Sequence, residues 1–240
     1  MALSANFNNN LLLEILTPST MDIAGYIDHT YLKADTTTSH IIRLCEEAMQ
    51  YGFASVCVPP FFVQTAAQML KAKGSKIPVA TVVGFPMGYA TTASKIEEIK
   101  RAADDGAAEI DAVINVSAIK SQNWAYVRND MDSMTTAAGL KGKKIKIIIE
   151  TGLLELEEID RICDLALEIK PHFLKTSTGF NGTGATLTKV RRMKAKLGDQ
   201  IAIKASGGIK TFSKAKSFID AGASRIGASA SIQIVEQSRK

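Results

Sequence analysis

Strand-like and helix-like segments alternate along almost the whole chain of 240 residues, and this alternation limits the possible folds more than any other feature. Short runs rich in Val and Ile end at Gly, Pro or polar residues, and each is followed by apolar residues at helical spacing. The predicted strands are a first one leading into 28–30, then 53–58, 77–85, 109–115, 145–150, 173–177, 201–205 and 225–228. The predicted helices are 39–51, 61–73, 91–105, 121–140, 155–169, one ending near 196, 214–221 and a last one after 228.

Eight such alternations predict a parallel sheet whose faces are covered by helices. In a chain of this length the sheet is expected to close into a (β/α)8 TIM barrel, an α/β fold. An open doubly wound sheet is the alternative, but no GxGxxG follows the first strand, which disfavours it. No linker or low-complexity segment divides the chain, so one domain over 1–240 is predicted. Helical spacing at 7–16 predicts a short N-terminal helical extension within 1–20.

Composition excludes several classes of function. A hydrophobic content of 46% is enough for a large core, so a mainly disordered chain is excluded. The net charge of +5 is spread along the chain and aromatic residues make up only 6%, which disfavours nucleic-acid binding and suits small anionic ligands. The three cysteines lie far apart, which predicts free thiols in a reducing compartment and no metal site. No apolar run reaches the length of a membrane span and no secretory leader begins the sequence, so a cytoplasmic protein is expected.

Two neighbouring predicted strands each carry a lysine just before a glycine-containing turn, Lys175 in 173–179 and Lys204 in 201–208. Active sites of barrels lie at the carboxyl ends of the strands, and adjacent strands are about 4.8 Å apart. The two ammonium groups would therefore repel, and burial would also favour a neutral amine, which forms Schiff bases with carbonyl compounds. The structural alternative is that each lysine forms a buried ion pair with a carboxylate such as Asp111 or Glu150.

Asp111 shares one face of its predicted strand with Glu109 and Val113. An inward carboxylate beside amines can transfer protons as a general acid or base. It can also serve as an ion-pair partner of Lys175, Lys204 or Lys146, and the two roles are compatible. Lys146 has the strand parity that faces the lumen of a barrel, where it either contacts ligand or forms a core ion pair.

Glycines follow the last three predicted strands, at positions 179, 207, 208 and 227. Barrels commonly bind phosphate through backbone N–H groups of these loops, so a phosphate site is predicted here, with Lys210 as a possible added charge. Ordinary turns are the alternative, because glycine ends strands in many proteins. His29 has two interpretations, a hydrogen-bonded loop residue or a catalyst.

Seven short motifs resemble the deoxyribose-phosphate aldolases, a family of class I (Schiff-base) aldolases. The resemblance covers most of the chain from about Ile27, and the motifs stand in the right order at the predicted strand ends. They are IDHT at 27–30, VGFP at 83–86, EID at 109–111, IIET at 148–151, FLKTSTG at 173–179, IKASGG at 203–208 and RIGAS at 225–229.

The resemblance implies three catalytic residues. Lys175 would form the Schiff base, Lys204 would lower its pKa, and Asp111 would relay protons. The implied reaction is the reversible cleavage of 2-deoxy-D-ribose 5-phosphate to D-glyceraldehyde 3-phosphate and acetaldehyde, without metal or cofactor. The predicted substrate- and phosphate-binding residues are Asp28, Thr30, Cys57, Lys146, Thr176, Gly179, Gly207, Gly208, Gly227 and Ser229. The implied partner is a phosphorylated aldehyde, with no nucleic acid or membrane, in a homodimer or homotetramer.

The sequence departs from the pattern of some relatives at three places. Phe180 stands where some carry a phosphate-contacting lysine, Ala230 stands where some have a second serine, and the tail lacks a C-terminal tyrosine. Two other functions compete with the aldolase. One is a Schiff-base barrel of the transaldolase type that acts on a ketose phosphate, and the other is a barrel that binds a sugar phosphate without turnover.

Overall fold

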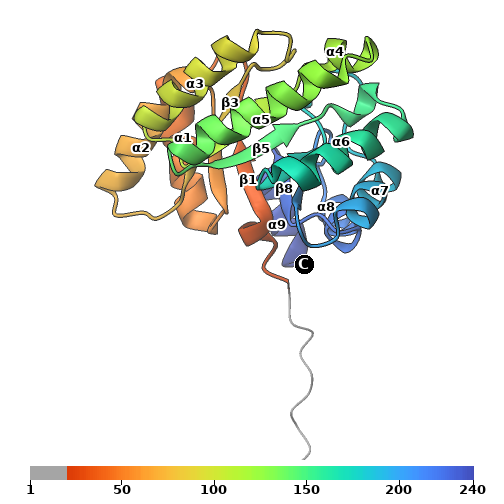
Figure 1. Cartoon of the computed structure of the whole chain (residues 1–240). Coiled ribbons are helices and arrows are strands. Elements are labelled where there is room, and N and C mark those ends of the chain that lie inside the picture. The colour runs from red at the N-terminus through yellow and green to blue at the C-terminus, as the bar shows by residue number, and fades with distance from the viewer. Residues whose placement is uncertain (1–20) are drawn as a thin grey trace, which may run out of the picture.

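The computed structural model describes residues 21–240, in which eight parallel strands close into a barrel surrounded by helices (Figure 1). Each strand pairs with the next one in sequence, and β8 pairs with β1. The strands are β1 Ile27–Thr30, β2 Ser55–Val58, β3 Val79–Val83, β4 Glu109–Val113, β5 Lys144–Ile148, β6 Phe173–Lys175, β7 Ala202–Ser206 and β8 Arg225–Ala228. The prediction of a (β/α)8 barrel is confirmed. The predicted extension within 1–20, including the helix at 7–16, lies outside the described residues.

The helices lie outside the barrel, with α3, α5 and α6 next to one another across the face that Figure 1 presents. The α-helices are α1 Thr38–Tyr51, α2 Val63–Ala72, α3 Thr92–Asp104, α4 Val116–Lys120, α5 Trp124–Leu140, α6 Leu156–Ile169, α7 Leu187–Leu197, α8 Phe212–Asp220 and α9 Ser231–Ser238. Short 3-10 helices η1 Ile23–Tyr26, η2 Pro60–Phe62 and η3 Thr151–Leu153 precede β1, precede α2 and follow β5, respectively.

Threonine hydroxyls begin four of these helices. Thr37, Thr91, Thr186 and Thr211 each accept a hydrogen bond from a backbone N–H in the first turn of α1, α3, α7 and α8. Such caps satisfy amide groups that have no partner within the helix. They fix where each helix starts after its loop, and the loops before α7 and α8 belong to the site described below.

The predicted helix 121–140 corresponds to α5 and begins three residues too early, and the short helix α4 before it was not predicted. Asn115 caps α4 and Asn123 caps α5 through side-chain oxygens, and Gln122 between them has a positive φ of 57°. Several predicted strands also extend too far, since β3, β5 and β6 end at Val83, Ile148 and Lys175. The residues that follow these strands leave the sheet and enter the loops at the mouth of the barrel.

The two faces of the barrel strands differ in chemistry. Outward residues such as Ile110, Ile147 and Ile203 pack against the helices in one continuous hydrophobic core. A separate small apolar cluster contains Cys57, Ala80 and Val82 from β2 and β3, with Leu32 and Phe85 against it. Much of the remaining lumen holds charged side chains, buried on β1 and β4 to β7 and partly buried on β8, which are unusual in a protein interior.

Within residues 21–240 no helix is both long enough and apolar enough to cross a membrane.

Candidate active site

The carboxylate of Asp111 on β4 lies at the centre of the charged lumen. Its Oδ1 accepts a hydrogen bond from Lys146 Nζ at 2.7 Å. Its Oδ2 accepts from Lys175 Nζ at 2.8 Å and from Lys204 Nζ at 2.7 Å. Parallel register explains the grouping, since Asp111 lies opposite Lys146 and Lys175 lies opposite Lys204. The structure therefore brings together the three residues predicted to be catalytic, with Lys146 as a fourth member.

Further charged groups connect to these residues on the side of Asp28. Asp28 contacts Lys204 and accepts from Arg225 Nη1 at 2.5 Å. Glu109 lies 2.7 Å from Lys146 Nζ and 3.1 Å from Arg225 Nη1. Neither Arg225 nor Glu109 was predicted from the sequence to belong to the site. The inward parity of Glu109 was visible in the sequence, but its partner on β8 depends on how the barrel closes.

Burial is the main cause of the unusual ionisation of Lys175, whose side chain is only 5% exposed. Burial lowers its pKa and the positive charge of Lys204 adds to this effect, while the Asp111 carboxylate opposes both. The expectation that Lys204 lowers the Lys175 pKa is thus supported, but repulsion is the smaller contribution. Burial also acts on Lys204, yet the carboxylates of Asp111 and Asp28 outweigh it and raise the pKa of Lys204.

A cavity of about 410 Å³ opens at the carboxyl ends of β1, β6, β7 and β8, and Lys175 reaches it from the lumen. The loop after β6 contributes Thr178, Gly179 and Phe180, and three lysines in all line the cavity: Lys175, Lys33 and Lys210. The predicted binding residues that line it are Thr30, Gly179, Gly207, Gly208, Gly227 and Ser229.

The other predicted binding residues do not line this cavity. Asp28, Lys146 and Thr176 are fully buried, and Cys57 is 1% exposed. Lys146 forms the core ion pairs that the sequence left as its alternative role. Thr176 Oγ1 donates to the Ser206 carbonyl and accepts from its N–H, which ties β6 to β7. Burial raises the pKa of the Cys57 thiol, so this thiol is protonated at neutral pH.

Glu150, the other suggested ion-pair partner, instead holds the loop after β6. It follows β5 with a positive φ of 53° and accepts hydrogen bonds from Thr178 N and Oγ1, the latter at 2.5 Å. Asn181 Nδ2 donates to it at 3.4 Å. The loop is also packed tightly against the next one, because a Cβ on Gly184 would lie 2.3 Å from the Gly207 carbonyl oxygen. These contacts fix the backbone that forms the cavity wall.

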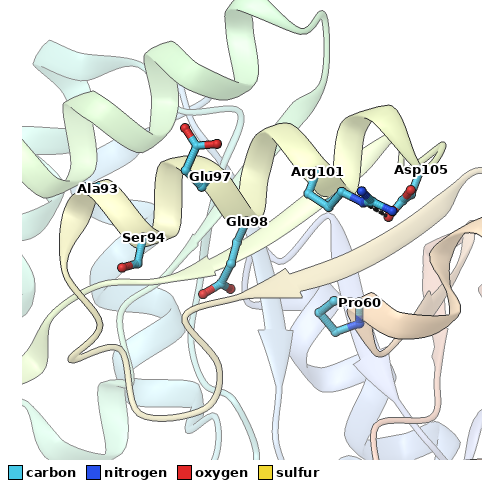
Figure 2. A pocket seen from close by; sticks show the side chains of 8 residues that line it. Pro60, Ala93, Ser94, Glu97, Glu98, Arg101 and Asp105 are labelled. Atoms are coloured by element: carbon cyan, nitrogen blue, oxygen red, sulfur yellow. Dashed lines mark hydrogen bonds and ion pairs between the residues drawn. The ribbon is translucent and has the colours of Figure 1, made fainter.

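A larger hollow, of about 620 Å³, lies on the outer surface along α3 and beside Pro60 (Figure 2). Figure 2 shows Glu97, Glu98 and Arg101 on α3, with Arg101 paired to Asp105 at 2.9 Å. No residue of the charged lumen lines this hollow. Because Lys175 lines the smaller cavity, that cavity is the candidate active site.

Comparisons with known proteins agree with this geometry. A profile described as DeoC/LacD family aldolase matches residues 23–235. A deoxyribose-phosphate aldolase from Thermococcus gammatolerans is 47% identical over 219 residues, which cover 91% of this chain and 97% of the relative. One from a Geobacillus species is 49% identical over 216 residues, covering 90% and 95%.

Solved structures of aldolases are similar as well. The tetrameric deoxyribose phosphate aldolase from Aeropyrum pernix superposes with a TM-score of 0.85 at 27% identity, covering 92% of this chain and 93% of that one. A structure named QR15, an aldolase, has a TM-score of 0.84 at 36% identity, covering 90% and 95%.

Proposed function

The chain belongs to the DeoC/LacD family of aldolases, and we propose that it reversibly cleaves 2-deoxy-D-ribose 5-phosphate to D-glyceraldehyde 3-phosphate and acetaldehyde through a Schiff base on Lys175. One observation carries the proposal above all others. Lys175 is buried at the cavity with a lowered pKa, and its Nζ lies 2.8 Å from a carboxylate that can move protons. A neutral amine beside a proton-transfer group is what Schiff-base catalysis requires.

In the cleavage direction the Lys175 amine attacks C1 of the open-chain sugar, and loss of water gives an iminium ion. The C3 hydroxyl then loses its proton and the C2–C3 bond breaks. Its electrons move toward the iminium nitrogen, so glyceraldehyde 3-phosphate leaves and an enamine remains. Protonation at C2 and hydrolysis release acetaldehyde and the free amine. The synthetic direction reverses these steps.

Lys204 and Asp111 have different roles in this mechanism. Lys204 keeps its proton, because Asp28 and Asp111 both stabilise its charge, and this charge favours the neutral form of Lys175. Asp111 remains ionised in the free enzyme, since the lysines around it outweigh burial and hold its pKa well below the usual range. Together with water it accepts and returns the proton of the acetaldehyde-derived carbon.

The phosphate would lie against the backbone of the loops after β6, β7 and β8, where Gly179, Gly207, Gly208 and Ser229 line the cavity. Backbone N–H groups in such loops are suited to phosphate oxygens. Lys210 and Lys33 line the same cavity and supply positive charge near it. Phe180, at the place where some relatives carry a lysine, instead packs edge-on against Phe85 at 5.1 Å.

Borohydride reduction in the presence of acetaldehyde tests the proposal. We expect an N-ethyl group on Lys175, located by peptide mass mapping, and no such product in Lys175→Ala. A matched control is Lys100→Ala, which removes an exposed lysine on α3 and should leave trapping unchanged. Trapping only with a ketose phosphate would support the transaldolase-type reaction, and no trapping with either substrate would support a barrel that only binds. A Lys175→Ala enzyme with full cleavage activity would exclude the Schiff base.

We further infer a cytoplasmic homodimer or homotetramer. The solved relative from Aeropyrum pernix is tetrameric, which supports an oligomer. The thiols of Cys45, Cys57 and Cys163 are free and buried, as suits a reducing compartment. Light scattering coupled to size-exclusion chromatography would measure the oligomeric state, and a monomer at micromolar concentration would contradict the inference.

A further inference from the structure

We propose that Glu109 and Arg225 are positioning residues that set the charge of Lys175 from the opposite end of the barrel lumen. Glu109 is the first residue of β4 and Arg225 the first residue of β8, whereas the cavity lies at the other ends of the strands. The proposal rests on the proposed function, because it concerns the amine that forms the Schiff base. It adds that the ionisation of this amine depends on the charge balance of a whole buried network.

Ion pairs of 3.7 Å or less join seven side chains in this network. Arg225 contacts Asp28 and Glu109, and Lys146 contacts Glu109, Asp111 and, at 3.7 Å, Asp28. Lys204 contacts Asp28 and Asp111, and Lys175 contacts Asp111. The members, called the lumen network below, are three carboxylates and four cationic groups: Asp28, Glu109, Asp111, Lys146, Lys175, Lys204 and Arg225.

With every member ionised, the lumen network carries four positive and three negative charges and has a net charge of +1. An uncompensated charge inside a protein is costly, because the interior solvates it much less well than water does. Loss of one proton from a cationic member removes the excess. The network is therefore balanced when one of its amines is neutral.

The contacts decide which member loses the proton. A guanidinium does not deprotonate in proteins, so Arg225 is excluded. Lys146 and Lys204 each contact two or more carboxylates, and these attractions raise the pKa of both amines against the effect of burial. Lys175 contacts only Asp111, and it shares that carboxylate oxygen with Lys204. Lys175 is the least stabilised cation, and it is also the one at the cavity.

Three further titratable groups face the lumen network, and none of them forms an ion pair with Lys175. The Cys57 thiol on β2 has a pKa raised by burial and is neutral. Glu150 after β5 is hydrogen-bonded to Thr178 and Asn181, and burial raises its pKa while the charge of Lys175 acts against this. It forms no ion pair with the network, and its interaction with Lys175 is common to all the variants compared below. Lys144 lies 3.8 Å from Glu109 but its side chain is 56% exposed, so water screens its charge.

Substitutions of Arg225 and Glu109 should then shift the pKa of Lys175 in opposite directions. Without the charge of Arg225 the network is neutral when Lys175 is protonated, so the Lys175 pKa rises. Without the charge of Glu109 the excess is +2 when Lys175 is protonated, so its pKa falls. Removing both charges restores the original balance. A purely structural role predicts no such reversal, because the double variant would be the most damaged of the three.

The experiment measures the rate of borohydride trapping with acetaldehyde as a function of pH, for the full chain and its variants. We expect the midpoint to move to higher pH by about half to one unit in Arg225→Met and to lower pH by a similar amount in Glu109→Gln. The double variant should return to the wild-type midpoint. Arg225→Lys, which keeps the charge, and Lys144→Met, which removes an exposed one, should shift it little.

The outcomes separate this inference from the proposed function. No trapping of Lys175 in the wild-type chain would refute the proposed function itself. Trapping with normal chemistry, but with midpoints that do not move or that move the same way in Arg225→Met and Glu109→Gln, would refute the charge-balance role. If Arg225→Met does not fold, as judged by thermal unfolding, Glu109→Gln and Arg225→Lys still decide the matter, since only the first should lower the midpoint.

Discussion

Lys175 and Lys204 lie opposite each other in the register of β6 and β7, and their Nζ atoms contact the same oxygen of Asp111, at 2.8 and 2.7 Å. Two ammonium groups so close would repel strongly without the carboxylate between them. The shared oxygen offsets part of that repulsion, and it holds the fully buried amine of Lys204 next to Lys175, which lines the cavity. Burial then has the largest effect on the Lys175 pKa, with Lys204 adding to it.

Replacing Lys204 by leucine should displace the pH profile of Schiff-base formation to higher pH. The substitution removes a nearby positive charge and leaves the Asp111 oxygen to Lys175 alone, and both changes favour the protonated amine. Each unit by which the pKa of Lys175 rises reduces the neutral fraction of its amine about tenfold. Activity at pH 7 should therefore fall by at least that factor. The trapping rate as a function of pH measures the effect. An unchanged midpoint would remove the role proposed for Lys204.

Asp111→Asn should separate the two halves of the reaction. The carboxamide cannot accept the proton, so exchange of the acetaldehyde methyl protons with D2O should slow by about 10²- to 10⁴-fold, as for other lost acid–base groups. Trapping at Lys175 should persist, since the loss of a negative charge lowers the Lys175 pKa further. NMR of exchange and mass mapping of trapping are the two measurements. Equal losses in both would mean that Asp111 acts only by holding the lysines in place.

The phosphate site predicts a difference between phosphorylated and unphosphorylated sugars. Lys210→Ala should raise KM for 2-deoxyribose 5-phosphate by about tenfold, the cost of one charge-assisted contact, and leave the turnover of 2-deoxyribose unchanged. Phe180→Lys should lower KM for the phosphorylated sugar, because Phe180 is 55% exposed at the same cavity. Lys216→Ala, on the exposed side of α8, is the matched control. Equal effects on both sugars would place the phosphate elsewhere.

The alternation of faces along a strand was sufficient to predict that Lys175, Lys204 and Asp111 point into the barrel. A strand alternates its faces, and the order of strands in a closed parallel barrel follows from eight short strand–helix repeats. The same reasoning placed the start of the helix at 121 rather than at Trp124, and it missed the short helix α4 at 116–120. Where these two helices begin depends on local caps at Asn115 and Asn123 rather than on periodicity.

Contacts across the lumen were much harder to predict. Arg225 reaches Asp28 because β8 pairs with β1, and it reaches Glu109 across the barrel, so both contacts depend on closure and strand tilt rather than on neighbours in sequence. Glu150 has the parity of an inward residue, but the chain turns at its positive φ and directs the carboxylate to Thr178. The fold and the grouping of Lys175, Lys204 and Asp111 were thus more predictable than the charges that surround them.

The buried carboxylates predict a specific loss of stability in acid. The three lysines around Asp111, and Lys204, Lys146 and Arg225 around Asp28, outweigh burial and lower the pKa of both carboxyl groups below the usual 3.8. A lowered folded-state pKa contributes stability that is complete above the unfolded-state pKa and is lost as the pH falls below it. The contribution of these groups to the free energy of unfolding should therefore be nearly constant from pH 7 to about 5 and fall steeply below about 4.

Asp28→Asn should lower the free energy of unfolding at pH 7 by about 3–5 kcal/mol, as expected when one member of a buried pair is removed. It should also flatten the dependence of stability on acid. Urea titrations between pH 3 and 7 measure both effects, with Asp220→Asn, which breaks an exposed pair on α8, as the control. An acid dependence equally steep in Asp28→Asn and the control would show that other groups cause it.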